Sequence, residues 1–346
     1  MGEAKRIVYV RERSAKKKEK KPKIVRPALF GWLKILFFLF LAAVLFRRFD
    51  FRTFSFFSKE RHPAEQKDRT SDDSERLFLD ERTAGATAAL ASIRIAFWNL
   101  EPFDLAKIAD PVVGRRVAEI VAENDLTALV GLRSSNRMMI QALLHRLNGR
   151  IDERFAALVS EPNTFDESVA FVYRIDRIAV DARRTLLLTD GLGGFGPPIY
   201  AAAFAAKGAE TQSRFTFTAV AFRVETGTDR KSPITPGDIY RAVRENAGYG
   251  GVAEDDILLL GSLEAEPQEL GDIRLIPNLA TVNNRIATDS QGRVVDHIIF
   301  DTHSTAEYLQ RYGVTDIAER FAVTRDEAKK IADHSPVWAE FSAMEN

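Results

Sequence analysis

A long apolar segment constrains this chain of 346 residues more than any other feature. Residues 28–46 read ALFGWLKILFFLFLAAVLF, and Lys34, near the N-terminal end, is their only charged residue. About 20 apolar residues suffice for a helix to cross a bilayer. The alternatives are a buried core helix and a cleaved signal peptide. The segment has no polar face and ends in Phe46-Arg47-Arg48-Phe49 instead of small residues, so we expect an uncleaved transmembrane helix.

The segment before this apolar run is strongly basic. Residues 1–26 contain eleven Lys and Arg against three Glu, so they cannot bury a core and we expect them to be disordered. Anionic lipid headgroups fit a basic tail next to a membrane segment better than nucleic acid does. The positive-inside rule predicts a cytoplasmic N-terminus and a C-terminal body across the membrane, although Arg47 and Arg48 on the far side weaken this orientation.

The formal net charge of +0 hides this asymmetry. Subtracting the tail's eleven basic and three acidic residues from 49 of each leaves 38 basic and 46 acidic residues. Because Lys and Arg supply most of the affinity for phosphate backbones, we expect no tight binding of nucleic acid. The chain has no cysteine, which excludes disulfides, cysteine zinc sites and thiol nucleophiles.

Residues 47–91 are predicted to form a juxtamembrane segment and linker. The Phe-rich stretch at 49–57 suits a membrane interface, and a polar stretch follows it. From about residue 92, short apolar runs alternate with helical periodicity, which favours sheets packed face to face with helices outside. Strands are expected at 93–98, 126–130, 169–173, 215–222, 257–260, 294–300 and 337–341, and helices at 138–147, 236–245 and 324–331. The GLGGFG run at 191–196 lacks the Lys-Ser/Thr of a phosphate-binding loop and is predicted to be a surface loop.

Six of these segments together resemble the endonuclease/exonuclease/phosphatase superfamily, particularly its deoxyribonuclease I branch. They are RIAFWNLEPF (94–103), DLTALVGLRSS (125–135), ESVAFVYR (167–174), DILLLGSLEAEP (256–267), VVDHIIFD (294–301) and ADHSPVWAEF (332–341). The resemblance implies a four-layer αββα sandwich of two mixed β-sheets over residues 92–346. It also implies hydrolysis of phosphoesters with Mg²⁺ or Mn²⁺, if the protein is active.

The resemblance carries some of the family's functional positions onto this chain. The retained positions are Asn99, Glu167, Asp296, Asp333 and His334. In the family, the equivalents of Asp296 and His334 form a carboxylate–imidazole pair at the scissile phosphate, and the equivalent of Asp333 belongs to the metal or water environment. These residues could also be retained for structure alone, since a site and not a fold decides function.

Other family positions are replaced. The metal-binding Glu falls on Gly131, the His that pairs with the equivalent of Glu167 falls on Arg223, the water-orienting Asp falls on Ser262, and the neighbouring Asn falls on Glu264. An arginine cannot act as a general base, because it does not lose its proton in a protein. We therefore predict a Glu167–Arg223 salt bridge and an absent or greatly slowed metal-dependent reaction.

Three functions remain open from the sequence. The first is a catalytically impaired, membrane-anchored binding or scaffold protein, in which Arg133, Arg223 and His334 could bind a phosphate-containing ligand or anionic lipid. The second is an active metal-dependent phosphodiesterase or nuclease in which Glu264 replaces the missing metal carboxylate. The third is a structural envelope protein.

Overall fold

The computed structural model describes residues 8–10, 91–133, 137–149, 155–164, 166–189, 197–208, 213–224, 234–246 and 254–345. They belong to one compact unit, Met1–Ser14 with Asp80–Asn346. The expected transmembrane segment (28–46), nearly all of the juxtamembrane segment and the GLGGFG run lie outside the described residues. Among the residues that are described, no helix combines the length and the apolar character that a membrane crossing needs.

Two β-sheets form the centre of this unit. The first has six strands in the order β12 (Tyr308–Val314), β13 (Val337–Ser342), β2 (Ser92–Phe103), β3 (Leu126–Arg133), β5 (Glu167–Arg174) and β4 (Phe155–Val159). The second has seven in the order β1 (Val8–Val10), β6 (Ile178–Thr189), β7 (Ile199–Ala206), β8 (Thr216–Arg223), β9 (Ile257–Ser262), β11 (Asp296–Asp301) and β10 (Leu279–Thr281). Each sheet is mixed, because β2–β3 and β8–β9 are parallel and the other pairs are antiparallel.

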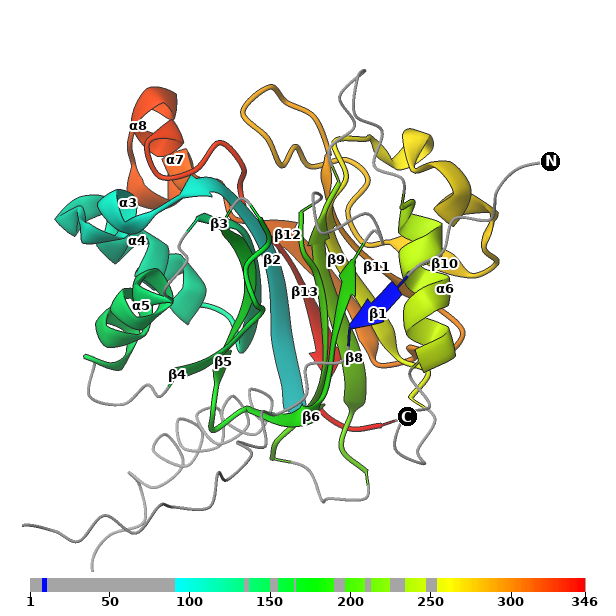
Figure 1. Ribbon diagram of the computed structural model, residues 1–346. Coiled ribbons are helices and arrows are strands. Elements are labelled where there is room, and N and C mark those ends of the chain that lie inside the picture. The colour runs from blue at the N-terminus through cyan, green and yellow to red at the C-terminus, as the bar shows by residue number, and fades with distance from the viewer. Residues whose placement is uncertain are drawn as a thin grey trace, which may run out of the picture. The chain divides into compact units, whose positions relative to one another are not determined.

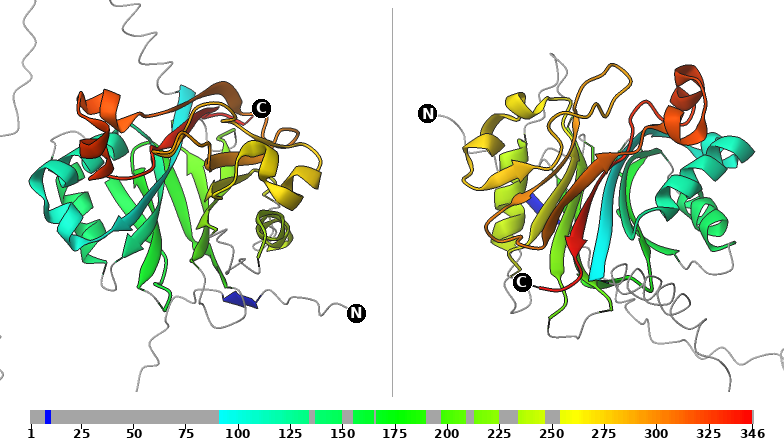
Figure 2. Two further views of the ribbon diagram at one scale, coloured as in Figure 1. Left: turned by 90° about the horizontal axis from the view of Figure 1, so that it is seen from above. Right: turned by 180° about the vertical axis from the view of Figure 1, so that it is seen from behind.

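Helices cover the outer faces of both sheets (Figure 1). On the outside of the first sheet lie α3 (Leu105–Ala109), α4 (Pro111–Ala122), α5 (Met138–Asn148), α7 (Ile317–Phe321) and α8 (Arg325–Lys329). On the outside of the second sheet lie α6 (Pro236–Asn246) and the short 3₁₀ helices η1 (Pro267–Glu269) and η2 (Gly271–Leu275). The view from above in Figure 2 shows the same succession of helix, sheet, sheet and helix. The expected sandwich of two mixed sheets flanked by helices is confirmed.

The helices begin where side chains satisfy their first free amides. Asp110 accepts hydrogen bonds from the backbone of Val112 and Val113 at the start of α4. Thr324 and Glu327 form a reciprocal capping box at α8. The Thr235 hydroxyl accepts from the Asp238 amide at 3.1 Å, as expected for the start of α6. Such caps each contribute about 1 kcal/mol and set where a helix begins.

The main core lies between the two sheets and is rich in aromatic rings. Phe171 of β5 packs edge-on against Phe204 of β7, with ring centroids 5.2 Å apart. Phe215 stacks on both Phe217 and Phe341, at 5.0 and 5.8 Å, and so connects the second sheet to the last strand of the first. Strands from both ends of the chain therefore share one core, which fixes the relative positions of the strand ends where the candidate site lies.

Several elements differ from the sequence-based expectation. Strands β4, β6, β7, β10 and β12 were not predicted, and β7 is the most instructive case because its sequence, IYAAAFAA, is dominated by the helix-favouring residue alanine. Every residue of β7 is buried, so small side chains are what the close packing there accepts. Within the tail expected to be disordered, Val8–Val10 forms β1 and pairs antiparallel with β6; the rest of residues 1–26 is not described.

Candidate functional site

The strand register brings the predicted site residues to one end of the sandwich. Arg223, the last residue of β8, is paired with Ser262, the last residue of β9, and Ser262 is paired with Asp296 at the start of β11. In the other sheet Glu167 begins β5, opposite Arg133 at the end of β3. Because strand ends of both sheets meet here, these side chains lie around one site.

An ion-pair network centred on Arg223 occupies the middle of this end. Its guanidinium donates two hydrogen bonds to one oxygen of Glu167, at 3.3 and 3.2 Å, and one to the other oxygen, at 3.0 Å. The Arg223 and Glu167 side chains are only 8% and 7% exposed. The salt bridge predicted from the sequence is therefore confirmed. Burial raises the pKa of Glu167, and the Arg223 guanidinium counteracts that rise.

Glu101, which the sequence interpretation did not single out, completes the network. Its carboxylate lies 2.5 Å from the Arg223 guanidinium and 3.0 Å from that of Arg133. Glu101 follows Asn99 by two residues on β2, and alternate residues of a strand share one face. A carboxylate two positions after the family Asn was thus the available sequence signal. The two arginines and two carboxylates cancel in charge.

Gly131 and Glu101 are sterically coupled. Gly131 has φ +74°, and a Cβ at that position would lie 2.6 Å from both the Cβ and the backbone nitrogen of Glu101. The structure therefore leaves no room for a side chain at position 131. The backbone and Cβ of Glu101 fill this space, and the Glu101 carboxylate is directed to two guanidinium groups.

Both the nitrogen and the oxygen of the Asn99 side chain form hydrogen bonds. Its side-chain nitrogen donates to the Ser262 hydroxyl at 3.2 Å, which connects the two sheets. Its side-chain oxygen accepts from the Glu101 backbone amide at 3.1 Å. With an exposed fraction of 2%, the amide is buried, and these hydrogen bonds hold the end of β2 against β9.

The Asp296–His334 pair is intact. The His334 Nδ1 lies 2.7 Å from an Asp296 carboxylate oxygen, and Asp296 is 1% exposed. The Trp98 indole donates to the His334 carbonyl at 2.8 Å and fixes the backbone beside the ring. Burial lowers the pKa of His334, but Asp296, together with Glu264 and Asp333, outweighs burial and raises it.

The remaining two predicted residues are turned to other partners. Glu264 is 3.9 Å from the His334 Nε2 and 3.1 Å from the Arg293 guanidinium. Asp333 accepts a hydrogen bond from the Ser290 hydroxyl at 2.5 Å. Both therefore border the Asp296–His334 pair and lie beside the 282–295 loop that leads into β11.

These residues do not fit a divalent cation of the family type. A hard cation needs several oxygen ligands free to face it. Here the Glu167 and Glu101 oxygens face guanidinium groups, the Asn99 oxygen accepts from a backbone amide, and position 131 has no side chain. Among the described residues, the only three acidic or histidine groups whose ligand atoms gather within 4.8 Å lie elsewhere, at residues 254–256.

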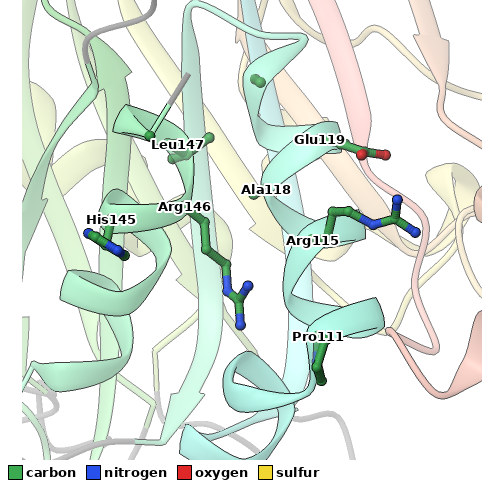
Figure 3. A pocket seen from close by; sticks show the side chains of 9 residues that line it. Pro111, Arg115, Ala118, Glu119, His145, Arg146 and Leu147 are labelled. Carbon is green, nitrogen blue, oxygen red and sulfur yellow. The ribbon is translucent and has the colours of Figure 1, made fainter. Parts of the chain in front are cut away.

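A pocket of about 390 Å³ lies in the helical layer and not at this site (Figure 3). It is bordered by Arg115 and Glu119 of α4 and by His145 and Arg146 of α5. Arg146 is held by the Ile108 carbonyl at 2.9 Å. None of the site residues predicted from the sequence lines this pocket.

Comparison with known proteins gives consistent matches. Human deoxyribonuclease-1 is 25% identical over 289 residues, which cover 73% of this chain and 96% of that protein. Human deoxyribonuclease-1-like 2 is 29% identical over 108 residues, which cover 30% of this chain and only 36% of that protein. No protein-family model matches the chain.

Solved structures share the fold. The endonuclease/exonuclease/phosphatase from Bacteroides vulgatus superposes with a TM-score of 0.51 at 14% identity, covering 73% of this chain and 99% of that one. The human Nocturnin catalytic domain, solved with a bound sulfate, gives a TM-score of 0.52 at 15% identity, covering 73% and 93%. With the strand order, the Asp296–His334 pair and the deoxyribonuclease matches, the chain belongs to the endonuclease/exonuclease/phosphatase superfamily.

Proposed function

We propose that this protein is a membrane-anchored superfamily member with impaired catalysis that serves as a binding or scaffold protein. The observation that carries the proposal is the position of Arg223, whose guanidinium is held between Glu167 and Glu101 at 3.0 and 2.5 Å. Superfamily members are metal-dependent phosphoester hydrolases. This chain instead places a permanent side-chain cation among the carboxylates of the site.

Admitting a metal ion here requires breaking the network first. Arg223 is buried with its two carboxylates, and removing one partner of such a group leaves an uncompensated charge. A dication next to the guanidinium also adds repulsion of several kcal/mol at an effective dielectric of about 20. For another residue to act as general base or as metal ligand here, the ion pairs of Arg223 with Glu167 and Glu101 would have to break.

Hydrolysis of a simple phosphodiester tests this proposal. The purified full-length protein, in Mg²⁺ or Mn²⁺, is compared with the variants His334→Ala and Arg325→Ala on bis(4-nitrophenyl) phosphate. Arg325 is 73% exposed and pairs with Asp316 outside the site. Its variant therefore controls for effects of mutation and purification that do not concern the site. We expect all three proteins to give the same background rate. A metal-dependent rate that only His334→Ala abolishes would contradict the proposal.

The intact Asp296–His334 pair favours a second function, residual phosphoester hydrolysis. The imidazole is oriented by a buried carboxylate, its pKa is raised, and Glu264 lies 3.9 Å from its other nitrogen. The alternative requires Glu264 to leave Arg293 and act at the site, with Mg²⁺ or Mn²⁺ as cofactor. A rate lost in both Glu264→Gln and His334→Ala, but kept in Arg325→Ala, would favour this function over the first.

A phosphate-containing anion remains the proposed ligand of the binding function. Arg133 is the accessible cation of the network, with its side chain 53% exposed, and its pairing with Glu101 would have to loosen. Titration with inorganic phosphate should show weak binding that Arg133→Gln abolishes and Arg325→Gln does not. Equal binding by both variants would remove Arg133 from the proposal.

The membrane part of the proposal rests on residues 28–46 and the basic tail, with an extracytoplasmic C-terminal domain. A single crossing makes a strong structural demand. It places residues 8–10 and β6 on opposite sides of the membrane, so the β1–β6 pair could not form within that molecule.

An introduced disulfide decides between a single crossing and the β1–β6 pair. The chain has no cysteine, and Val8 is paired with Thr189, so Val8→Cys with Thr189→Cys gives one reporter pair. In a single-crossing molecule we expect no intramolecular disulfide in intact membranes. Its formation there would contradict the crossing, and a Val8→Cys, Ser304→Cys pair serves as the mismatched control.

A further inference from the structure

Strand β4 forms one edge of the first sheet. Among the residues that the structure describes, β4 pairs only with β5 and has no strand on its other side (Figure 1). Its sequence, FAALV, contains no charge, proline or glycine, and its pairing with β5 runs without a bulge from Phe155 to Val159. Such an edge is a template for pairing with a further strand, because half of its backbone groups point away from the sheet.

The other described edges are less suited to pairing. β12, at the far edge of the first sheet, has a bulge between Tyr308 and Arg311, with Gln310 at φ 57° and the Arg311 side chain 61% exposed. At the edges of the second sheet, β1 and β10 have three residues each. Bulges, charged side chains and short strands are the usual means of keeping an edge from pairing. β4 has no bulge or charge and reaches the usual length of a strand.

A hydrogen bond beyond the end of β4 shows which of its backbone groups point outward. The Ser160 amide donates to the Val169 carbonyl of β5 at 2.9 Å, so Ser160 faces β5. Successive residues of a strand direct their backbone groups to opposite sides. Phe155, Ala157 and Val159 therefore direct theirs to the open side of the sheet.

The side chain of Asn148, the last residue of α5, already satisfies the first of these three residues. Its nitrogen donates to the Phe155 carbonyl at 3.0 Å, and its oxygen accepts from the Phe155 amide at 2.7 Å, as a neighbouring strand would do. Ala157 and Val159 have no such partner among the described residues. β4 thus presents two N–H and two C=O groups to a strand beside it.

We propose that β4 pairs antiparallel with β4 of a second copy of this chain, about a twofold axis at Leu158. In this register Ala157 lies opposite the partner's Val159, and Val159 lies opposite the partner's Ala157. Two residues that face each other across an antiparallel pair exchange two hydrogen bonds. All the outward groups of both strands are then used, and the two six-stranded sheets become one continuous sheet.

The pattern of the edge favours a second copy over an unrelated extended segment. The exposed stretch is confined between Phe155, which Asn148 occupies, and the end of β4 at Val159. Self-pairing at Leu158 uses that stretch completely. No like charges face each other, because the strand is uncharged, and its side chains offer nothing that would select a charged peptide. This inference is independent of the proposed function, because it uses only β4.

A single introduced cysteine tests the register, since the chain has none of its own. With the axis at Leu158, the Cβ atoms of two Leu158→Cys copies lie about 4.5–5.5 Å apart, near the span of a disulfide. Two Ala156→Cys copies are offset by four residues, about 13 Å along the strand. Ala156 is half-buried like Leu158, so its variant is the matched control.

We expect mild oxidation of the full-length protein in detergent to give a disulfide-linked dimer with Leu158→Cys and not with Ala156→Cys. The proposal is overturned if Leu158→Cys gives no dimer, or if both variants give the same amount.

Removal of one outward donor tests the pairing without a cysteine. Ala157→Pro deletes an N–H that points away from β5, so the β4–β5 pair should persist. A single strand pair is a small interface, and sedimentation velocity should show a wild-type dimer with a dissociation constant of about 10–100 µM. Ala157→Pro should weaken it about tenfold or more, because each dimer loses two of its four inter-strand hydrogen bonds.

Arg325→Ala, outside the sheet, should dimerise as the wild type does. A wild type that stays monomeric up to about 1 mM would overturn the proposal. So would a dimer that Ala157→Pro leaves unchanged, since its contacts would then lie elsewhere in the chain.

Discussion

The carboxylates at the two ends of β9 differ in whether they form salt bridges. At the Ser262 end, Glu101 and Glu167 face the guanidinium groups of Arg133 and Arg223, so every charge has an internal counterion. At the Asp256 end, Glu254, Asp255 and Asp256 gather with no salt bridge to a described residue.

This contrast relates charge to function in the same fold. The end where the superfamily binds its metal has acquired its own cations, and a divalent ion there would have to displace them. The Asp256 end, which the superfamily motifs do not mark, gathers three carboxylates that form no salt bridge with a described residue. Perturbing each end should therefore affect stability in opposite directions.

The largest effect should come from removing the central cation. Arg223→Ala leaves Glu167 and Glu101 facing each other without a counterion, and breaking a buried ion pair in this way costs about 3–5 kcal/mol. Urea unfolding measures the change. Adding Glu167→Gln should restore part of the loss, because it removes one of the two orphaned charges. A loss below about 1 kcal/mol would mean the network is already screened by water.

A side chain at position 131 should be the next most disruptive change. Gly131→Ala adds a Cβ 2.6 Å from Glu101 to the strain of φ +74°, and we expect a loss of about 2–3 kcal/mol. Gly271→Ala is the matched control, because Gly271 has φ +64° with nothing within 4 Å of its Cβ position. The Gly271→Ala variant should lose only the stability that the strained backbone costs, about 1 kcal/mol. Equal losses would show that Glu101 does not crowd position 131.

At the Asp256 end, neutralising a carboxylate should stabilise the protein. The pKa of Asp256 is raised from 3.8 to about 8, so the folded state holds a proton that the unfolded state releases. Its contribution is present below about pH 4 and is lost as the pH rises toward 8. We expect Asp256→Asn to be more stable than the wild type at pH 8 and equally stable at pH 4. Thermal unfolding at both pH values measures this, and a loss at pH 8 would contradict it.

The smallest effect concerns the histidine of the retained pair. Asp296 outweighs burial and raises the pKa of His334, so the stability from protonation is present below about pH 6.5 and lost as the pH rises through the folded-state pKa. Asp296→Asn should lower the pKa of His334, because the imidazolium then loses the carboxylate that outweighs burial. NMR titration of the imidazole resonances gives the value, with His303 on the surface as internal reference. An unchanged pKa would remove Asp296 as the cause.

The sequence predicted the elements with strong local patterns and missed those set by packing. The β-branched and aromatic runs at β5, β8, β9 and β13 were identified, and so was the Thr235 cap of α6. The alanine-rich β7 could not be identified, because its strand conformation comes from its neighbours β6 and β8 and not from its own propensities.

The candidate site shows the same division. The Glu167–Arg223 and Asp296–His334 pairs followed from the superfamily motifs, and the structure contains both. The part played by Glu101 did not follow, because it depends on how closely the end of β2 approaches Gly131 and the Arg223 side chain. The position of Glu101 two residues after Asn99 was visible in the sequence, but its pairing with Arg223 of the other sheet leaves no pattern within either strand.

The central claim is that the Arg223 network excludes a divalent cation from the superfamily's site. Anomalous scattering from crystals equilibrated with Mn²⁺ measures this directly, because the ion is located without reference to activity. The account predicts no Mn²⁺ peak in contact with Glu101, Glu167 or Asp296. A peak beside the Arg223 guanidinium, with Glu101 and Glu167 turned toward it, would contradict the account.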